Sequence, residues 1–187
     1  MAIKALIEHD YLLSVVSQNT DGLHLRSGLD YGRLFELHGN RNLEECTSCK
    51  TKFFSSYRVR TKEDPKDHLT GRMCSQCGGS LKDMIIHFGE SLPKETLTSS
   101  LLLAANCSFC LALGSSLSVT PANIVPGTTL KYKGSLALVN LQTTPFDKYA
   151  RFRLHCMTDD AMRVVMAELG IEVREWKPNS EELIYKV

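Results

Sequence analysis

Residues 109–116 have the sequence Phe-Cys-Leu-Ala-Leu-Gly-Ser-Ser, an apolar run that ends in one glycine and two serines. An apolar run of this length without polar alternation is typical of a strand buried on both faces of a parallel sheet. The glycine and the serines mark the loop at the carboxyl end of the strand, where open α/β sheets bind ligands. The segment therefore predicts an α/β fold.

Helical and strand patterns alternate on both sides of this segment. Helices are expected over residues 1–9, 93–105 and 158–169. Further short strands are expected over residues 12–17, 84–88, 136–141 and 152–155. Pro93 is favoured in a first helical turn, and Gly170 is a typical residue at a helix end. Such alternation predicts a parallel sheet with helices on both faces.

Polar clusters follow four of the expected strands. They are Gln18-Asn19-Thr20-Asp21, Gly114-Ser115-Ser116, Asn140-Leu141-Gln142 and Cys156-Met157-Thr158. Each cluster alone is equally typical of a connecting loop. Because the carboxyl ends of parallel strands share one edge, four such clusters together favour a nucleotide-sized ligand.

Residues 41–83 interrupt this alternation and have no long apolar run. They carry two Cys-x-x-Cys pairs, separated by 24 residues: Cys46, Cys49, Cys74 and Cys77. A two-residue spacer brings two sulfurs to one ion, and structural zinc takes four tetrahedral thiolates. The pattern predicts one closed, structural Zn²⁺ site in an inserted module.

The third Cys-x-x-Cys pair, Cys107 and Cys110, begins an expected strand. Residues three apart on a strand point to opposite sides, so these two cysteines are expected to be small buried hydrophobic residues. Cys156 has no assigned role.

Composition indicates a soluble, globular protein, with 43% hydrophobic and 23% charged residues and a net charge of +1. No apolar run approaches the ~18 residues of a membrane span, so no membrane partner is expected. Residues 1–10 carry no secretory signal, which favours an intracellular protein. The module 41–83 holds nine basic and six acidic residues. This surplus leaves open a weak chromatin or nucleic-acid contact, although a solvated surface is the plainer interpretation.

Two motifs together resemble the signature of the sirtuin family of NAD-dependent protein-lysine deacylases. The first is Ser-Gln-Asn-Thr-Asp-Gly-Leu-His at 17–24, and the second is Glu-Leu-His-Gly-Asn at 36–40. Residues 85–90, 113–117 and 139–142 are similar to the family's Phe-Gly-Glu loop, its Gly-Ser-Ser-Leu turn and its Val-Asn-Leu-Gln segment. The resemblance covers about residues 1–175. It is closest to the class IV branch, especially the nucleolar sirtuin.

This resemblance implies a Rossmann-like parallel sheet with an inserted zinc module. The implied domains are residues 1–40 and 84–175 for NAD binding, 41–83 for zinc, and a tail at 176–187. It implies that His38 is the general base, for which imidazole suits because its unperturbed pKa lies near neutral pH.

The resemblance also implies contacts for NAD and for an acyl-lysine substrate. The implied NAD residues are Gln18, Asn19, Thr20, Asp21, Gly114, Ser115, Ser116, Asn140, Leu141, Gln142 and Thr158. The implied substrate loop consists of Ile86, Phe88, Gly89 and Glu90. Thr158 is the least matched, since Cys156-Met157 stands where the family has a glycine.

One family element has no counterpart in this sequence, the glycine-rich loop that cradles the phosphates. The resemblance therefore predicts an incomplete Rossmann-like sheet that lacks its first strand-helix unit. Either the sequence is a fragment or mis-started version of a complete enzyme, or it is a short inactive product. Three functions remain open: a deacylase of histones or other chromatin proteins, placed in the nucleus by the family branch; a non-catalytic zinc-containing interaction protein; and a zinc-ribbon nucleic-acid binder.

Overall fold

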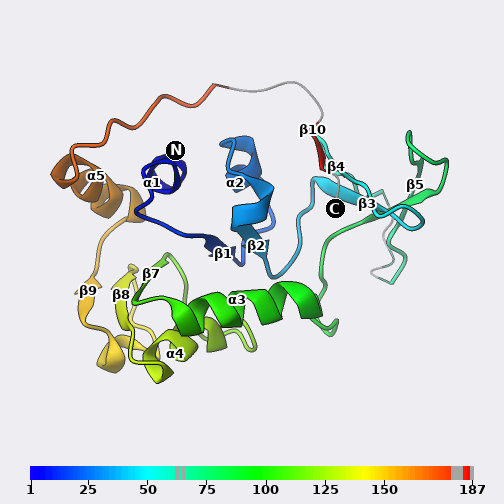
Figure 1. Cartoon of the computed structure of the whole chain (residues 1–187). Helices are drawn as coiled ribbons and strands as arrows, with labels where there is room; N and C mark the ends of the chain where they lie inside the picture. Colours follow the sequence, from blue (N-terminus) through cyan, green and yellow to red (C-terminus); the bar gives the residue numbers. More distant parts are fainter. Residues whose placement is uncertain (62–63, 65, 178–182, 186–187) are drawn as a thin grey trace. The chain divides into compact units, whose positions relative to one another are not determined.

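The computed structural model describes residues 1–61, 64, 66–177 and 183–185 (Figure 1). Lys62 and Glu63, which enter the charge count of the module, and positions 178–182 and 186–187 of the expected tail lie outside the described residues. The chain forms two units. The first comprises Met1–Leu12 and Lys94–Glu175, and the second comprises Leu13–Pro93 and Trp176–Val187.

The first unit contains a parallel sheet in the order β7-β8-β9. Its strands are β7 (Phe109–Leu113), β8 (Ser135–Val139) and β9 (Phe152–Leu154). In register, Leu113 lies beside Val139, and Val139 lies beside Leu154. The strands predicted at 109–113, 136–141 and 152–155 are thus confirmed, apart from end residues.

Helices cover both faces of this sheet, as Figure 1 shows. Alternate residues of a strand face opposite sides. Leu111 and Leu113 pack against a cluster from α1 (Ala2–Glu8) and α5 (Thr158–Glu168) that includes Leu6 and Met166. Cys110 and Ala112 pack on the other side with Leu136, Leu138 and Leu130 of α4 (Ile124–Lys131). Next to α4 lies α3 (Lys94–Asn106). The doubly covered parallel sheet predicted from the sequence is confirmed.

The second unit contains a parallel pair, β1 (Val15–Ser17) and β2 (Leu34–Glu36), linked through α2 (Leu23–Arg26) and the short helix η1 (Tyr31–Arg33). Ser17 lies beside Glu36 in register. Leu25 and Leu37 are both 1% exposed, so apolar burial holds this link against the strand ends.

The second unit also contains an antiparallel sheet in the order β10-β4-β3-β6-β5. The strands are β3 (Leu43–Cys46), β4 (Lys52–Phe54), β5 (Leu69–Met73), β6 (Ser80–Asp83) and β10 (Leu183–Tyr185). Cys46 and Cys74 are buried with Phe53 and Leu81. Four of these strands lie within residues 41–83, and β10, at residues 183–185, pairs with β4.

Residues 84–88 form no strand, so that prediction is wrong. Short apolar runs do not by themselves distinguish a strand from a buried loop. Here the Ile85 amide donates to Asp83 Oδ1 at 3.2 Å, and the Ile86 amide donates to the His38 carbonyl at 3.0 Å. These bonds leave the segment as an ordered loop without a strand partner.

Within the described ranges, no helix combines the length and the apolar character that crossing a bilayer requires.

Candidate functional site

The four predicted zinc ligands lie together in the second unit. The sulfurs of Cys46, Cys49, Cys74 and Cys77 all lie within 4.8 Å of one another. Two of the separations are 3.5 Å, between Cys46 and Cys77, and 3.6 Å, between Cys49 and Cys74. A tetrahedral zinc ion bound at about 2.3 Å separates its thiolates by about 3.8 Å. The cluster therefore fits one zinc ion with four protein ligands.

In the first Cys-x-x-Cys pair, Cys46 and Cys49, backbone amides stabilise the thiolate form. The amides of Ser48 and Cys49 point at Cys46 Sγ, at 3.4 and 3.5 Å. The Cys49 and then the Ser48 amide lower the pKa of Cys46, and bonds to Thr51 lower the pKa of Cys49 to about 6. Thiolates are the form that binds metal.

The second Cys-x-x-Cys pair, Cys74 and Cys77, shows why the cluster needs a cation. The Gly79 amide favours the Cys77 thiolate, but the sulfurs of Cys49 and Cys46 raise the pKa of Cys77 to about 11. Four adjacent thiolates repel one another, and a divalent ion removes that repulsion. A β-carbon at Gly79 would lie 3.0 Å from Cys46 Sγ, so the segment after Cys77 packs closely against the first cysteine pair.

The two sirtuin-like motifs meet at one edge of the β1-β2 pair. The Leu37 amide donates to the Ser17 carbonyl at 2.9 Å, which extends the parallel ladder one residue past β2. His38 Nδ1 then lies 3.1 Å from the Gln18 carbonyl oxygen. The predicted general base and the first predicted cofactor residue are therefore direct neighbours.

This contact determines which nitrogen of His38 can act as a base. A carbonyl oxygen only accepts, so Nδ1 carries the hydrogen in the neutral ring. Nε2 therefore keeps its lone pair. The ring is half-buried, so the lone pair sits on a positioned side chain at the edge of the pair.

Gly39 and Asn40 hold the histidine loop against the residues that follow β6. Gly39 has a φ of +72°, and a β-carbon there would lie 1.7 Å from the Met84 carbonyl oxygen. Asn40 is fully buried and donates from Nδ2 to both oxygens of Glu36, at 2.8 and 3.0 Å. The loop therefore tolerates no side chain at Gly39.

Glu36 is the most strongly perturbed carboxyl group near this loop. Burial raises its pKa to about 7, against the opposing effect of the Asn40 hydrogen bonds and with a further increase from the Asp21 charge. Perturbed carboxyl groups are common at functional sites. The sequence motif contains Glu36, but no pattern in the sequence assigned it a role.

The segment 18–21 presents polar groups beside this loop. Asp21 Oδ1 accepts from the Leu23 amide at 3.0 Å and thereby opens α2. The Thr20 carbonyl accepts from the Arg41 amide at 3.0 Å. Asn19 is exposed. The segment is thus fixed by its backbone, with the Asn19 side chain facing solvent.

The predicted substrate loop begins next to His38, through the Ile86 amide bond described above. At its tip, the side chain of Phe88 is fully exposed, and Gly89 has a φ of +90° with open space around its α-carbon. Glu90 Oε2 accepts from the His87 amide at 2.6 Å. The loop therefore presents an apolar ring to solvent on a turn closed by a carboxylate.

The remaining predicted cofactor residues share the carboxyl edge of β7-β8-β9 in the first unit. Gly114 has a φ of +61°, and a β-carbon there would lie 3.4 Å from Thr158 Cγ2. The Asn140 amide donates to the Leu154 carbonyl at 3.1 Å, and its side chain donates to the Gln142 carbonyl at 2.9 Å.

The serines and Leu141 complete this group. Ser115 Oγ accepts from the Leu117 amide at 3.2 Å, and Ser116 Oγ lies 2.8 Å from Ser118 Oγ. Leu141 is exposed. The predicted cofactor residues therefore form two groups, one in each unit: residues 18–21, and residues 114–116, 140–142 and 158.

Two other features of the first unit lie outside these groups. Cys107 Sγ is 3.3 Å from Thr129 Oγ1, and burial raises the pKa of Cys110 to about 11. Neither cysteine joins the metal cluster, but both are only half-buried, whereas full burial was expected.

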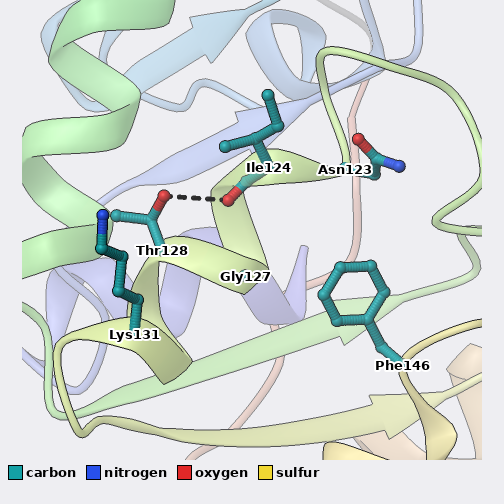
Figure 2. A pocket seen from close by; sticks show the side chains of 6 residues that line it. All are labelled: Asn123, Ile124, Gly127, Thr128, Lys131 and Phe146. Atoms are coloured by element: carbon teal, nitrogen blue, oxygen red, sulfur yellow. Dashed lines mark hydrogen bonds between the residues drawn. The ribbon is translucent and has the colours of Figure 1, made fainter.

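An open hollow of about 410 Å³ lies on α4. Figure 2 shows the side chains that line it. Asn123, Ile124, Gly127, Thr128, Lys131 and Phe146 line it. The Thr128 hydroxyl, its main polar group beside Lys131, already donates to the Ile124 carbonyl at 2.9 Å. Because none of the motif residues lines it, the hollow is not assigned to the site.

Comparison with known proteins agrees with the motifs. Residues 1–121 match the model of the Sir2 family. The chain is 41% identical to the NAD-dependent protein deacetylase sirtuin-7 of Rattus norvegicus over 184 residues, which is 92% of this chain and 45% of that protein. It is 35% identical to the NAD-dependent protein deacetylase Sirt6 of Drosophila melanogaster over 187 residues, which is 97% of this chain and 59% of that protein. The chain thus spans about half the length of these relatives.

Solved structures show the same fold. A Sir2 structure bound to a propionylated peptide matches with a TM-score of 0.71 and 34% identity, over 91% of this chain and 70% of that one. A Sir2 complex with a p53 peptide and NAD⁺ matches with a TM-score of 0.71 and 34% identity, over 91% of this chain and 69% of that one.

Proposed function

The chain belongs to the Sir2 family, and on this premise we propose that it is an NAD-dependent protein-lysine deacetylase or deacylase. The reaction transfers the acyl group of an acylated lysine to ADP-ribose and releases nicotinamide. The observation that carries the proposal is the bond from His38 Nδ1 to the Gln18 carbonyl at 3.1 Å. It leaves Nε2 as the basic nitrogen, next to a segment suited to a nucleotide.

NAD supplies the ribose whose hydroxyl becomes the acyl acceptor. The proposed NAD contacts are taken unit by unit. Within the second unit they are Gln18, Asn19, Thr20 and Asp21, and within the first unit they are Gly114, Ser115, Ser116, Asn140, Leu141, Gln142 and Thr158. Gly114 supports this assignment, because a positive φ and a missing β-carbon let a ligand approach the backbone at a strand end.

His38 acts in this proposal as the general base. Nε2 takes the proton from the ribose hydroxyl, while Nδ1 keeps its hydrogen on the Gln18 carbonyl. The ring then carries a positive charge that this carbonyl dipole stabilises. General-base catalysis of this kind contributes about 10²- to 10⁴-fold to a rate.

The loop of Ile86, Phe88, Gly89 and Glu90 binds the peptide that carries the acyl-lysine. Its position beside His38, through the 3.0 Å bond from the Ile86 amide, supports this role. The exposed ring of Phe88 offers apolar surface to a peptide. Sir2 structures similar to this chain contain acetylated and propionylated peptides.

The proposed substrates are histones or other chromatin proteins in the nucleus. Similarity to sirtuin-7 over 92% of the chain supports this choice. The basic surplus of residues 41–83 would add a weak attraction to chromatin.

The test is deacetylation of an acetyl-lysine histone peptide by the zinc-loaded chain, followed by release of nicotinamide. His38→Tyr is expected to lower the rate at least 100-fold. The exposed histidine His9, changed to Tyr, serves as the matched control and keeps full activity. Equal rates for His38→Tyr and the wild type would exclude this function.

NAD titration by calorimetry separates the proposal from its alternative. A folded, zinc-loaded chain that binds no NAD would favour a zinc-containing interaction protein.

A further inference from the structure

A histidine of the zinc module contacts the predicted substrate loop. His68 immediately precedes β5, and its backbone carbonyl accepts from the Asp83 amide at 2.8 Å. Its Nδ1 lies 3.0 Å from Asp83 Oδ1, and its Nε2 lies 2.8 Å from Glu90 Oε1. The ring therefore bridges the end of β6 and the end of the loop.

The Asp83 side of this bridge is rigid. The Asp83 side chain is 1% exposed, and its second oxygen accepts from Arg60 Nη1 at 2.7 Å, where the Arg60 side chain is 5% exposed. The first oxygen, Oδ1, also accepts from the Ile85 amide at 3.2 Å, so both oxygens of this side chain act as acceptors. Asp83 therefore only accepts, and His68 Nδ1 must carry a hydrogen.

The Glu90 side then requires a second hydrogen on the same ring. A neutral imidazole with its hydrogen on Nδ1 would turn a lone pair at Nε2 toward the Glu90 carboxylate at 2.8 Å, which is repulsive. The doubly protonated ring donates to both carboxylates. Arg60, His68, Asp83 and Glu90 then form a neutral set of two cations and two anions.

Glu90 transmits this contact to the loop. Its other oxygen accepts from the His87 amide at 2.6 Å, and its own amide donates to the His87 carbonyl at 3.1 Å. The loop thus has two fixed ends: the Ile86 amide on the His38 carbonyl, and Glu90 on His68. Between them lies the exposed Phe88.

We propose that His68 is a positioning residue, which holds the 86–90 loop in its peptide-binding shape through its ion pair with Glu90. This inference rests on the proposed function for the role of the loop, but the contact itself does not. The groups that face the His68 ring are Asp83, Glu90 and His87, whose ring centroid lies 5.7 Å away, with Arg60 behind Asp83.

The titration of these groups agrees with the geometry. Burial opposes the charge on His68, but the bonds to Glu90 and Asp83 exceed it and raise the pKa of His68. The His87 amide and then the His68 bond lower the pKa of Glu90. A raised histidine pKa means that the bridge is present at low pH and weakens as the pH rises through that pKa.

The first test measures the loop without catalysis, by hydrogen exchange of the amides at 87–90 in the zinc-loaded chain. His68→Asn keeps a donor toward Asp83 but cannot reach Glu90, and it is expected to speed exchange about tenfold. Glu90→Gln changes no residue of the zinc module and should speed exchange by a similar factor. His9→Asn should leave the exchange rate unchanged. Unchanged exchange in both loop variants, with zinc content intact, would overturn the proposal.

The second test measures the substrate by steady-state kinetics with an acetyl-lysine peptide. His68→Asn is expected to raise the KM for the peptide about tenfold, with kcat and the KM for NAD nearly unchanged. In the wild type, the peptide KM should rise as the pH increases beyond the ordinary histidine pKa of about 6.5. In His68→Asn it should stay flat. If His68 had a purely structural role, His68→Asn would instead lower the zinc content and kcat. That result would contradict a positioning role.

The two tests separate the possible failures. Faster exchange in a chain without deacetylase activity would sustain the His68 contact and reject the proposed function. Unchanged exchange and an unchanged peptide KM in a chain with deacetylase activity would reject the His68 proposal and sustain the proposed function.

Discussion

Replacing Gly39 with alanine tests whether the histidine loop is locked by backbone contact. The added β-carbon would lie 1.7 Å from the Met84 carbonyl oxygen, and such contacts need at least 3.0 Å. Met84 must therefore withdraw. Its withdrawal breaks two hydrogen bonds, the one that the Met84 carbonyl accepts from the Asn40 amide and the one from the Ile86 amide to the His38 carbonyl.

The magnitude follows from three contributions. Alanine in the left-handed region costs about 1–2 kcal/mol, and each lost hydrogen bond costs about 1 kcal/mol. The expected loss in free energy of unfolding is therefore about 3–4 kcal/mol. Gly71→Ala is the matched control in the same unit, since Gly71 has a φ of +80° with nothing within 4 Å of an added β-carbon. It should lose only the first contribution, about 1–2 kcal/mol.

Urea unfolding of the zinc-loaded chain measures both values. With a slope of about 2 kcal/mol per molar urea, the two midpoints should differ by about 1 M. Because His38 adjoins the displaced peptide, Gly39→Ala should also lose about 100-fold in kcat/KM. If both glycine variants unfold at the same urea concentration, steric locking of the loop by Met84 is wrong.

Three further outcomes follow from the described contacts. The raised pKa of Glu36 means that the protonated form stabilises the fold below pH 4.5 and that this stability is lost as the pH rises through about 7. Glu36→Gln should therefore have a free energy of unfolding about 2–3 kcal/mol above that of the wild type at pH 8 and equal to it at pH 4.5. Urea titrations of both proteins at the two pH values measure this difference. Cys74→Ala should abolish stoichiometric zinc in metal analysis and lower the melting temperature by more than 10 °C, and retention of both would refute a four-cysteine site. Gly134→Ala places a β-carbon 2.8 Å from the Cys107 carbonyl and should cost about 1–3 kcal/mol, with an unchanged midpoint counting against the tight contact.

Periodicity and motif spacing predicted most elements of the first unit, but not the helix α4. The run at 109–113 is β7, and the helices expected at 93–105 and 158–169 are α3 and α5 to within a residue or so. β7 pairs with β8, and α3 packs against α4, so these elements contact partners close in the sequence, while α5 packs against the distant α1. Each element still has a clear periodicity of its own, which is why local patterns locate it. The cysteine cluster was also predictable, because ligand chemistry fixes its spacing.

The features that the sequence could not predict depend on distant partners. Met84–Phe88 has the composition of a strand, but Asp83 and His38 take its amides and leave a loop. Glu36 acquires its raised pKa from tertiary burial, and His68 acquires its two carboxylate partners from residues 15 and 22 positions away. No local pattern marks such residues.

The path of the chain explains how a closed zinc site can influence His38, which no zinc ligand contacts among the described hydrogen bonds. The two ends of the module meet directly beside His38, since the Asn40 and Met84 backbones are bonded to each other and the Met84 amide donates to the Leu43 carbonyl at 3.1 Å. Cys46 ends β3, which begins at Leu43, and Cys77 shortly precedes β6, which ends at Asp83. When zinc clamps these two strand ends, β3 and β6 stay paired in register, with Glu44 beside Asp83. The peptide planes on both sides of the histidine loop are then fixed. Loss of the metal should therefore increase the motion of the His38 loop, although the effect reaches the loop through β3 and β6 and not through a zinc-binding cysteine.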